Sequence, residues 1–349
     1  MEIRNIVYLY TEIMPYQTIV YKELSKRGFG VHAFYNDKGR QTPFKPEIIK
    51  NVFYYPNSIY SPQQLLEKVQ MLKPEILVVC GWSSSKYMYV AKQYKKAGEI
   101  PVVCPIDTQY IGRWKQRIGF LIAPFYIKRH FTHIWVPGVR QYYFARRMGY
   151  KPQNIILNSL TGNVNLFKQS NLNAKNINYP KSFLYVGRYH EVKGLHLLMQ
   201  VWDSIKNKKG WRIICAGNGP LKEILENRHD VEVLGFQSQT DLVQLSEKCG
   251  AFILPSNYEP WALVLQEFAA AGLPILCSTA CGASPHFVIN GYNGAIFKTN
   301  DFNDLKSKIE WIMSLSDDEL RDMSNRSRTL SKFVNPQISA ASLLSVIYK

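Results

Sequence analysis

The sequence lacks the features of a membrane-spanning or secreted protein. None of its apolar runs reaches the ~18 residues that a membrane-spanning helix needs. Residues 1–17, MEIRNIVYLYTEIMPYQ, have no basic segment followed by a long apolar core and a small-residue cleavage site. They predict a first β-strand, and we expect a cytoplasmic protein.

The sequence also has few cysteines, and most of them are far apart. Three of the six, Cys80, Cys104 and Cys215, end short apolar runs typical of buried strands, so we expect reduced core cysteines. Cys277 and Cys281 lie close together but lack a second pair or a histidine cluster, which is weak evidence for a metal.

Glycine-rich nucleotide loops are missing as well. The first strand is followed by TEIMPYQ, and AGNGP at residues 216–220 matches neither of the common phosphate-loop patterns. A dinucleotide oxidoreductase is therefore disfavoured. On its own AGNGP, which contains Gly217 and Asn218, indicates a tight turn at the end of a strand.

Acidic residues are absent from a long central segment. Between Thr108 and His190 there is no Asp or Glu but there are thirteen Lys and Arg, within a chain of net charge +17. A one-sided basic region implies an anionic partner, which is a nucleic acid, a phospholipid surface or a phosphate-bearing substrate.

The 349 residues predict two domains rather than one. Short β-like runs alternate with helical stretches, and this series restarts in the second half, which predicts two doubly wound α/β domains that face across a cleft. The predicted strands are IRNIVYLY, GVHAFYN, EILVVCGW, PVVCPID and THIWVPG in the first half, and SFLYVGR, WRIICAGNG, VEVLGF, AFILPS and LPILCS in the second. We predict an N-terminal domain over 1–165 and a C-terminal domain over 180–330, joined by a polar linker at 163–182. A last helix over 336–349 is expected to pack back on the first domain.

Two acids stand in an otherwise apolar run, NYEPWALVLQEFAAAGLPI. Pro260 is suited to a first helical position, so we predict Glu259 at the mouth of a helix and Glu267 two turns further along it. The free amides of the first turn would bind an anion between the two acids; these amides are those of Trp261, Ala262 and Leu263. The alternative is that Glu259 is a cap and Glu267 a partly exposed helix residue.

A second motif, FLYVGRYHEVKGLHLLMQVW, places two cations after a strand of the same domain. Arg188 and Lys193 would neutralise a diphosphate leaving group as charge develops on it. A solvated basic turn is the alternative.

Together, VGRYHEVKG, AGNGP, VLGF, FILPSNYEPWALVLQEFAAAGLPILCS and VINGYNGAIF resemble, in order and spacing, the retaining glycosyltransferases of family 4, which have the GT-B fold. The resemblance covers most of residues 183–313. It implies transfer of a hexosyl unit from a nucleotide diphosphate sugar, with UDP-sugar favoured, to a glycan in bacterial surface-polysaccharide assembly. It also implies no metal and no cofactor, which agrees with the absence of Asp-x-Asp.

The resemblance also implies roles for individual residues. Arg188 and Lys193 match the pair that holds the donor diphosphate, Glu259 the acid that reaches the donor sugar, and Glu267 the acid that holds the ribose. The remaining donor-side residues are the first-turn residues Trp261, Ala262 and Leu263, the nucleobase segment Gly235 and Phe236, and Gly217 with Asn218.

The sequence departs from the family in three places. Ala262 stands where glycine is frequent, and His286 stands where Gly-Gly-x-Pro-Glu has its Glu, which concerns the sugar specificity. The first domain lacks the family's glycine-rich loop and its His, so Asp107 is only a candidate for acceptor contact, and a structural cap is an equal alternative.

A stretch inside the acid-free segment indicates the acceptor side. In RWKQRIGFLIAPFYIKRH, residues 113–130, basic ends flank about ten mostly apolar residues, a pattern that suits a helix lying on an anionic bilayer. A core helix with basic ends is the alternative. We expect a lipid-linked acceptor at the inner face of the cytoplasmic membrane, with Arg113, Lys115 and Arg117 near it.

Other functions are weaker predictions. An epimerase or phosphorylase would share the fold, but no lysine can be assigned to a pyridoxal cofactor. A non-catalytic sensor would not need Glu259. A basic protein that binds membrane or nucleic acid would explain the charge, yet no nucleic-acid motif occurs and the two acids would be unexplained.

Overall fold

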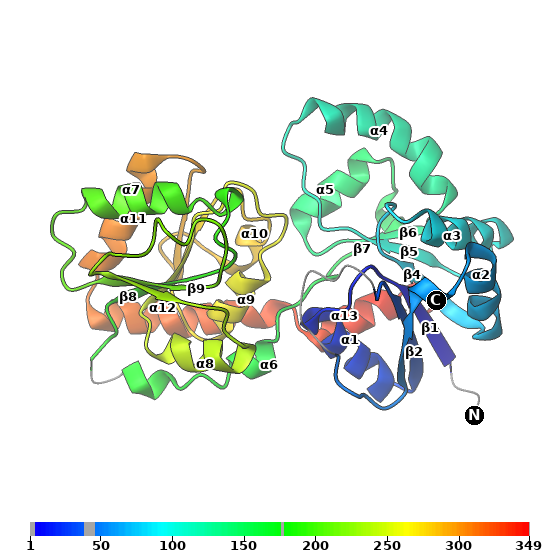
Figure 1. Cartoon of the computed structure of the whole chain (residues 1–349), viewed down its shortest axis with the longest axis horizontal. Helices are drawn as coiled ribbons and strands as arrows, with labels where there is room; N and C mark the ends of the chain where they lie inside the picture. The colour runs from blue at the N-terminus through cyan, green and yellow to red at the C-terminus, as the bar shows by residue number, and fades with distance from the viewer. Residues whose placement is uncertain (1–3, 38–45, 176–177, 349) are drawn as a thin grey trace. The chain divides into compact units, whose positions relative to one another are not determined.

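The computed structural model describes residues 4–37, 46–175 and 178–348, and it divides the chain into two compact units (Figure 1). Unit 1 comprises residues 1–161 and 334–349, and unit 2 comprises residues 162–333. The chain therefore passes between the units twice, after Thr161 and after Phe333.

Unit 1 is built on a seven-stranded parallel sheet in the order β3-β2-β1-β4-β5-β6-β7. The order reverses between β1 and β4, which makes the sheet doubly wound. Its strands are β1 (Arg4–Leu9), β2 (Phe29–Tyr35), β3 (Val52–Pro56), β4 (Pro74–Val79), β5 (Val102–Pro105), β6 (His133–Trp135) and β7 (Ile155–Ile156).

Helices cover both faces of this sheet because successive strand residues point to opposite sides. In β1, Val7 packs into the cluster formed with α2, α3 and α5, whereas Ile6 packs into the cluster formed with α1 and α13. The helices of unit 1 are α1 (Pro15–Lys26), α2 (Pro62–Met71), α3 (Ser85–Ala97), α4 (Trp114–Tyr126), α5 (Val139–Arg147) and α13 (Pro336–Leu344).

Helix α13 belongs to unit 1 although it follows unit 2 in the chain. It lies beside α1 (Figure 1), and Ala340, Leu343 and Leu344 are fully buried in the α1 side of the core. Asn158 Nδ2 also donates to Ser342 Oγ at 3.1 Å. Two stretches far apart in sequence thus complete one domain.

Unit 2 repeats the architecture with a six-stranded parallel sheet in the order β10-β9-β8-β11-β12-β13. Its chain order reverses between β8 and β11. The strands are β8 (Ser182–Val186), β9 (Arg212–Ala216), β10 (Val231–Leu234), β11 (Ala251–Leu254), β12 (Ile275–Ser278) and β13 (Gly294–Phe297).

Helices α7 and α11 lie on one face of the second sheet, and α8, α9 and α12 lie on the other (Figure 1). The predicted fold class, two doubly wound α/β domains, is confirmed for each unit. The helices of unit 2 are α6 (Val164–Phe167), α7 (Leu195–Ser204), α8 (Gln239–Glu247), α9 (Leu263–Ala270), α10 (Ser284–Phe287), α11 (Phe302–Ser314) and α12 (Asp317–Leu330).

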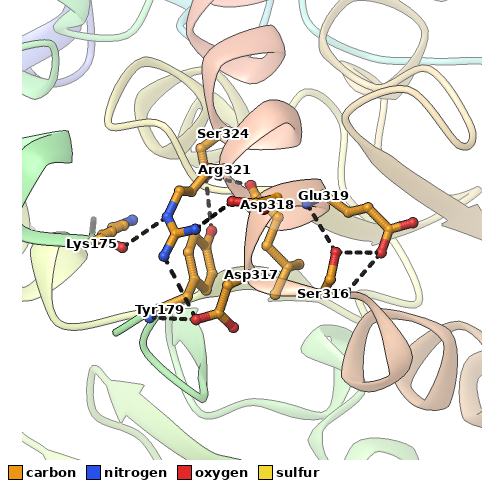
Figure 2. A network of polar contacts seen from close by, with 9 residues as sticks. Lys175, Tyr179, Ser316, Asp317, Asp318, Glu319, Arg321 and Ser324 are labelled. Atoms are coloured by element: carbon orange, nitrogen blue, oxygen red, sulfur yellow. Dashed lines mark hydrogen bonds and ion pairs between the residues drawn. The ribbon is translucent and has the colours of Figure 1, made fainter. Parts of the chain in front are cut away.

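The predicted linker at 163–182 is instead part of unit 2. Helix α6 packs on α8 and α9, and the described residues after it are held by α12 (Figure 2). Arg321 Nε donates to Lys175 O at 3.2 Å, Tyr179 N donates to Asp317 Oδ2 at 3.2 Å, and the Tyr179 hydroxyl lies 2.8 Å from Ser324 Oγ. These specific contacts hold the segment, so it needs no amphipathic face. Its sequence therefore shows no periodicity.

Cys104 and Cys215 lie in buried strands as predicted, whereas Cys80 follows β4 and is not fully buried. All six are free; Cys80 is half-buried and the others are buried. Among the described residues, no helix combines the length and apolar character that a bilayer span requires.

Candidate functional site

The switch point of unit 2 brings together two of the predicted residues. Ligands of doubly wound sheets bind where the strand order reverses, at the carboxyl ends of the strands. Lys193 lies on a short turn after β8, and Glu259 lies after β11. Lys193 Nζ donates to Glu259 Oε2, and the two side chains are only 16% and 14% exposed.

Backbone contacts fix the turn that holds Lys193. Asn257 N donates to Val192 O at 2.8 Å, and Asn257 Nδ2 donates to Glu191 O at 3.2 Å. Gly194 has φ 71°, and a Cβ on it would lie 2.0 Å from Pro255 O, so only glycine fits there. The loops after β8 and β11 therefore form one joined surface.

The predicted helix start at Pro260 is wrong. Helix α9 begins at Leu263, because the residues before it run alongside another segment and do not coil. Gly282 N donates to Glu259 O at 3.0 Å, and Ala283 N donates to Trp261 O at 2.7 Å. Glu259 thus precedes the helix by four residues. Of the predicted amides only that of Leu263 is helical, and Glu267 is one turn into the helix.

Ala262 caps this helix in an unusual backbone conformation. Its φ of 79° and ψ of 71° lie in the left-handed region that favours glycine. The turn from the Glu259 segment into α9 requires this conformation, and the methyl group is buried.

Glu267 is buried, which contradicts the alternative that it is a partly exposed helix residue. Its Oε1 accepts from Asn163 N at 3.5 Å and from Gln239 Nε2 at 3.1 Å. Burial raises the pKa of Glu267 to about 7, and the two hydrogen bonds oppose this rise. Among the described residues no hydrogen bond reaches Oε2, so this oxygen is the one through which the acid could accept from a ligand.

The partners of Glu267 were not predicted from the sequence. Asn163 was placed in a linker, and Gln239 was not singled out. The segment SQTD could have pointed to Gln239, because Ser238 and Asp241 form a capping box that begins α8 next to it.

Arg188 follows β8 and is exposed. Its charge and that of Glu259 both affect Tyr185. The Tyr185 hydroxyl donates to Arg188 O at 3.0 Å. The pKa of Tyr185 is raised mainly by burial, and among the smaller contributions the Glu259 carboxylate raises it and Arg188 lowers it. Both predicted charges therefore act on one phenol.

The predicted nucleobase residues Gly235 and Phe236 follow β10, and the other predicted donor-side residues, Gly217 and Asn218, follow β9. Gly217 N donates to Gly235 O at 3.2 Å, and a Cβ on Gly217 would lie 2.0 Å from Gly187 O. Tyr189 N donates to Asn218 O at 2.8 Å. These contacts join three neighbouring loops, and Phe236 stands out from them with 78% of its surface exposed.

Trp261, two residues after Glu259, lies beside His286. Their ring centroids are 5.3 Å apart. The Trp261 indole is buried, and its Nε1 has no hydrogen-bond partner among the described residues. The unusual His286 thus faces the segment that was assigned to the donor sugar.

The acceptor candidates lie in unit 1. Asp107 follows β5 and is exposed. Burial raises the pKa of Tyr16, and the carboxylates of Asp107 and Glu12 raise it further, so both lie near this phenol. Glu12, in the TEIMPYQ segment, was not predicted. Arg113 precedes α4, and Lys115 and Arg117 are exposed on it.

Helix α4 exposes most of its apolar residues, which contradicts the alternative of a core helix. Within it only Ala123 is buried. Leu121 is 74% exposed and Phe125 is 70% exposed. At helical spacing these residues form one stripe, which we call the α4 stripe: Trp114, Ile118, Leu121, Ile122 and Phe125.

No group of three or more His, Cys, Asp or Glu that could hold a metal ion occurs in residues 4–37, 46–175 and 178–348.

Comparison with known sequences identifies unit 2. Residues 167–330 match the family of glycosyl transferases group 1. An uncharacterised glycosyltransferase of Methanocaldococcus jannaschii is 32% identical over 109 residues, which are 29% of this chain and 28% of that protein. The matches to this protein and to two further curated relatives span between 28% and 39% of the relative's own length.

One relative matches over more of both chains. The N,N'-diacetylbacillosaminyl-diphospho-undecaprenol alpha-1,3-N-acetylgalactosaminyltransferase of Campylobacter jejuni is 29% identical over 86% of this chain and 80% of its own.

Solved structures resemble the whole chain. A sucrose-phosphate synthase of Thermosynechococcus elongatus matches with a TM-score of 0.77 and 16% identity over 99% of this chain and 98% of its own. The Anabaena protein HepE in complex with UDP matches with a TM-score of 0.73 and 15% identity over 99% and 100% of the two chains. The fold is therefore that of GT-B glycosyltransferases, and residues 167–330 form a glycosyl transferases group 1 domain.

Proposed function

We propose that the protein transfers a hexosyl unit from a UDP-sugar to a glycan acceptor in polysaccharide assembly. The observation that carries this proposal is the joined surface at the switch point of unit 2. A cation and an acid, Lys193 and Glu259, lie there in a group 1 domain that also contains the buried Glu267. The Anabaena structure with UDP supports the choice of nucleotide.

In this proposal Lys193 changes its partner when the donor binds. Without donor, Glu259 holds the ammonium group. A bound diphosphate, with more negative charge, would compete for Lys193 together with Arg188 and leave Glu259 free to accept from a sugar hydroxyl. The two cations would supply the counter-charge of the leaving group, so we expect activity without a metal ion.

We further propose the retaining reaction of family 4. The bond between the anomeric carbon and the phosphate oxygen breaks with its electron pair on the nucleoside diphosphate. The acceptor hydroxyl oxygen bonds to the anomeric carbon from the same face, and its proton passes to the departing phosphate oxygen. Glu267 would hold the ribose through Oε2.

The test is a thermal-shift panel of UDP, GDP and ADP, followed by product analysis with UDP-sugars in EDTA. A ligand at about 100 times its Kd stabilises the folded state by ~2.7 kcal/mol, so one nucleotide should raise Tm clearly. We expect Glu267→Ala and Lys193→Ala to weaken donor binding and Glu259→Ala mainly to lower turnover. Unchanged binding and turnover in all three variants would rule out the site.

The variants need a stability control because removing one member of a buried ion pair costs about 3–5 kcal/mol by itself. The double variant Lys193→Met/Glu259→Gln removes both charges together and should fold well. It should still lose donor binding. A sugar converted without any acceptor would indicate an epimerase instead.

We also propose that the acceptor is lipid-linked and that the α4 stripe contacts the inner face of the cytoplasmic membrane. The exposed apolar side chains stand among basic residues that include Arg113, Lys115 and Arg117, which suits an interfacial helix on anionic lipid. The diphospho-undecaprenol substrate in the name of the Campylobacter relative supports this choice.

Vesicle sedimentation tests the membrane proposal. We expect binding to vesicles that contain phosphatidylglycerol and little binding to pure phosphatidylcholine. Leu121→Glu/Phe125→Glu should abolish it, whereas Ile59→Glu, which changes another exposed apolar residue of unit 1, should not. Equal binding by both variants would show that α4 is not the contact.

A further inference from the structure

The two connections between the units approach the same helix of unit 2. One connection enters unit 2 at Gly162 and continues into α6, which packs on α9. The other leaves unit 2 after Phe333, at the end of the turn that follows α12, and this turn also contacts α9. Helix α9 is the helix that carries Glu267.

One side chain of α9 bonds to both connections. Gln266 is fully buried. Its Oε1 accepts from Gly162 N at 2.8 Å, and its Nε2 donates to Ser331 O at 3.0 Å. The Gln266 carboxamide thus forms hydrogen bonds with a backbone amide at the entry of unit 2 and with a backbone carbonyl near its exit.

The neighbouring Glu267 touches the entry connection as well. Asn163 N donates to its Oε1 at 3.5 Å. A Cβ on Gly162 would lie 2.7 Å from Glu267 Cγ, which is closer than side chains pack. The position of Glu267 and the path of the entry connection are therefore set together.

Arg328 holds the other end of α9 in a similar way. Its Nε donates to Ala270 O at 3.1 Å and its Nη2 donates to Ser170 O at 2.6 Å. Since Arg328 already fixes α9 to α12 and to the segment after α6, Gln266 is not needed to keep α9 in place. Its distinct contribution is to hold the two connections themselves.

We propose that Gln266 is a positioning residue that clamps both connections to α9. Nucleotide binding at Glu267 is then coupled to how rigidly the two connections are held. Coupling of this kind is reciprocal: a nucleotide that orders Glu267 also orders the connections, and ordered connections favour the nucleotide. The coupling, but not the clamp itself, depends on the proposed role of Glu267 in nucleotide binding.

Hydrogen exchange followed by mass spectrometry on the full chain tests the clamp without any ligand. Gln266→Met keeps the length of the side chain and removes both hydrogen bonds, so amides in both connections, around residues 160–165 and 331–336, should exchange at least tenfold faster. Gln266→Glu keeps an acceptor for Gly162 N and should speed exchange mainly at the exit. Gln141→Met removes another fully buried glutamine, from α5 of unit 1, and should affect neither connection.

UDP and UDP-glucose are the probes for the coupling. In the unchanged protein UDP should slow exchange in both connections. In Gln266→Met the UDP affinity should fall less than threefold, the slowing should disappear, and kcat should fall about tenfold with KM little changed. Gly162→Ala, which places a methyl group against Glu267, should lower both UDP affinity and kcat.

Each failure has a separate meaning. Exchange in Gln266→Met that matches the unchanged protein at both connections would overturn the clamp, whatever UDP does. Faster exchange with an intact response to UDP would overturn the coupling. Absence of UDP binding to the unchanged protein would overturn the proposed function and leave the ligand-free test of the clamp valid.

Discussion

Glu267 is proposed to bind the nucleotide, and its protonation would then affect nucleotide affinity. Its pKa is raised to about 7 by burial, so the folded state holds this proton more tightly than the unfolded chain does. Its contribution to stability is therefore fully present below about pH 4.5 and is lost as the pH rises through 7. Ribose hydroxyls donate hydrogen bonds, and they should bind the carboxylate better than the acid.

We therefore predict that UDP affinity rises severalfold between pH 6 and pH 8. Glu267→Gln should bind UDP more weakly, with little pH dependence over this range, and should be more stable than the unchanged protein at pH 8 but not at pH 4.5. Calorimetric titration and urea unfolding at each pH measure these effects. An equal pH dependence in both proteins would assign the titration to another group.

Ala262 offers a second test at the scale of one residue. A left-handed alanine costs about 1–2 kcal/mol, whereas loss of a buried methyl group costs ~0.8 kcal/mol. Ala262→Gly should therefore change the free energy of unfolding by less than about 1 kcal/mol, because the relief of strain offsets the lost methyl.

The matched control is Ala269→Gly, a fully buried change inside the same helix. It relieves no strain and should cost roughly 1–2 kcal/mol from helix propensity and burial. Urea unfolding measures both variants. Equal losses would contradict the strain at Ala262.

The residues of the site could be found from the sequence better than their partners could. Lys193 and Glu259 follow strands, and parallel strands end at a common edge, so their proximity was predictable. The bonds from Asn163 and Gln239 to Glu267 depend on tertiary packing of α6 and α8 against α9, which no local pattern encodes.

At the scale of elements, strands that form continuous apolar runs were predicted, including the three-residue β6, whereas the longer β3 was missed. The runs around β1, β2, β4 and β5 stand out by their apolar residues. Strands β3, β7 and β13 did not, because VFYYP is exposed or half-buried at four of its five residues, II has only two residues, and GAIF follows a turn without a clear boundary. The start of α9 was misplaced because pairing with residues 281–283 overrode the preference of Pro260 for a helical start.

The segment held by α12 contains Lys175 (Figure 2). The Lys175 side chain is buried, and its Nζ makes a long hydrogen bond of 3.5 Å to Gly272 O and lies near the Tyr179 ring. Burial lowers the pKa of Lys175 to about 7. Between pH 7 and the ordinary value near 10.5 the unfolded chain holds a proton that the folded state lacks, so stability rises with pH over this range.

We predict that Lys175→Met stabilises unit 2 by roughly 1–3 kcal/mol at pH 7, since it removes a buried charge. The gain should shrink as the pH approaches 10. Thermal unfolding of both proteins between pH 6 and pH 10 measures the difference. Lys168→Met, at an exposed position of the same segment, should show no such trend. A gain that is constant with pH would exclude the buried charge as its cause.

At the scale of the whole molecule, unit 1 depends on a helix that follows unit 2 in the chain. Leu343→Ala/Leu344→Ala should destabilise unit 1 by roughly 4–8 kcal/mol, because each change removes a fully buried leucine from the α1 side of the core. Unit 2 should keep its stabilisation by UDP. Calorimetry should therefore show a lower transition for unit 1 alone.

The control for this prediction is Leu305→Ala, a fully buried change in α11 of unit 2. It should lower the transition of unit 2 and spare that of unit 1. If both sets of changes lowered one common transition, the two units would unfold as a single cooperative body.

The position of α13 also has a consequence for the order in which the protein matures on the ribosome. All seven strands of unit 1 emerge before unit 2, but the helix that covers their α1 side next to Arg27 emerges only after unit 2. Unit 2 is continuous in the chain and is free to fold during that interval. During that interval part of the apolar face of unit 1 stays uncovered. The nascent chain should therefore bind chaperones that recognise apolar surface.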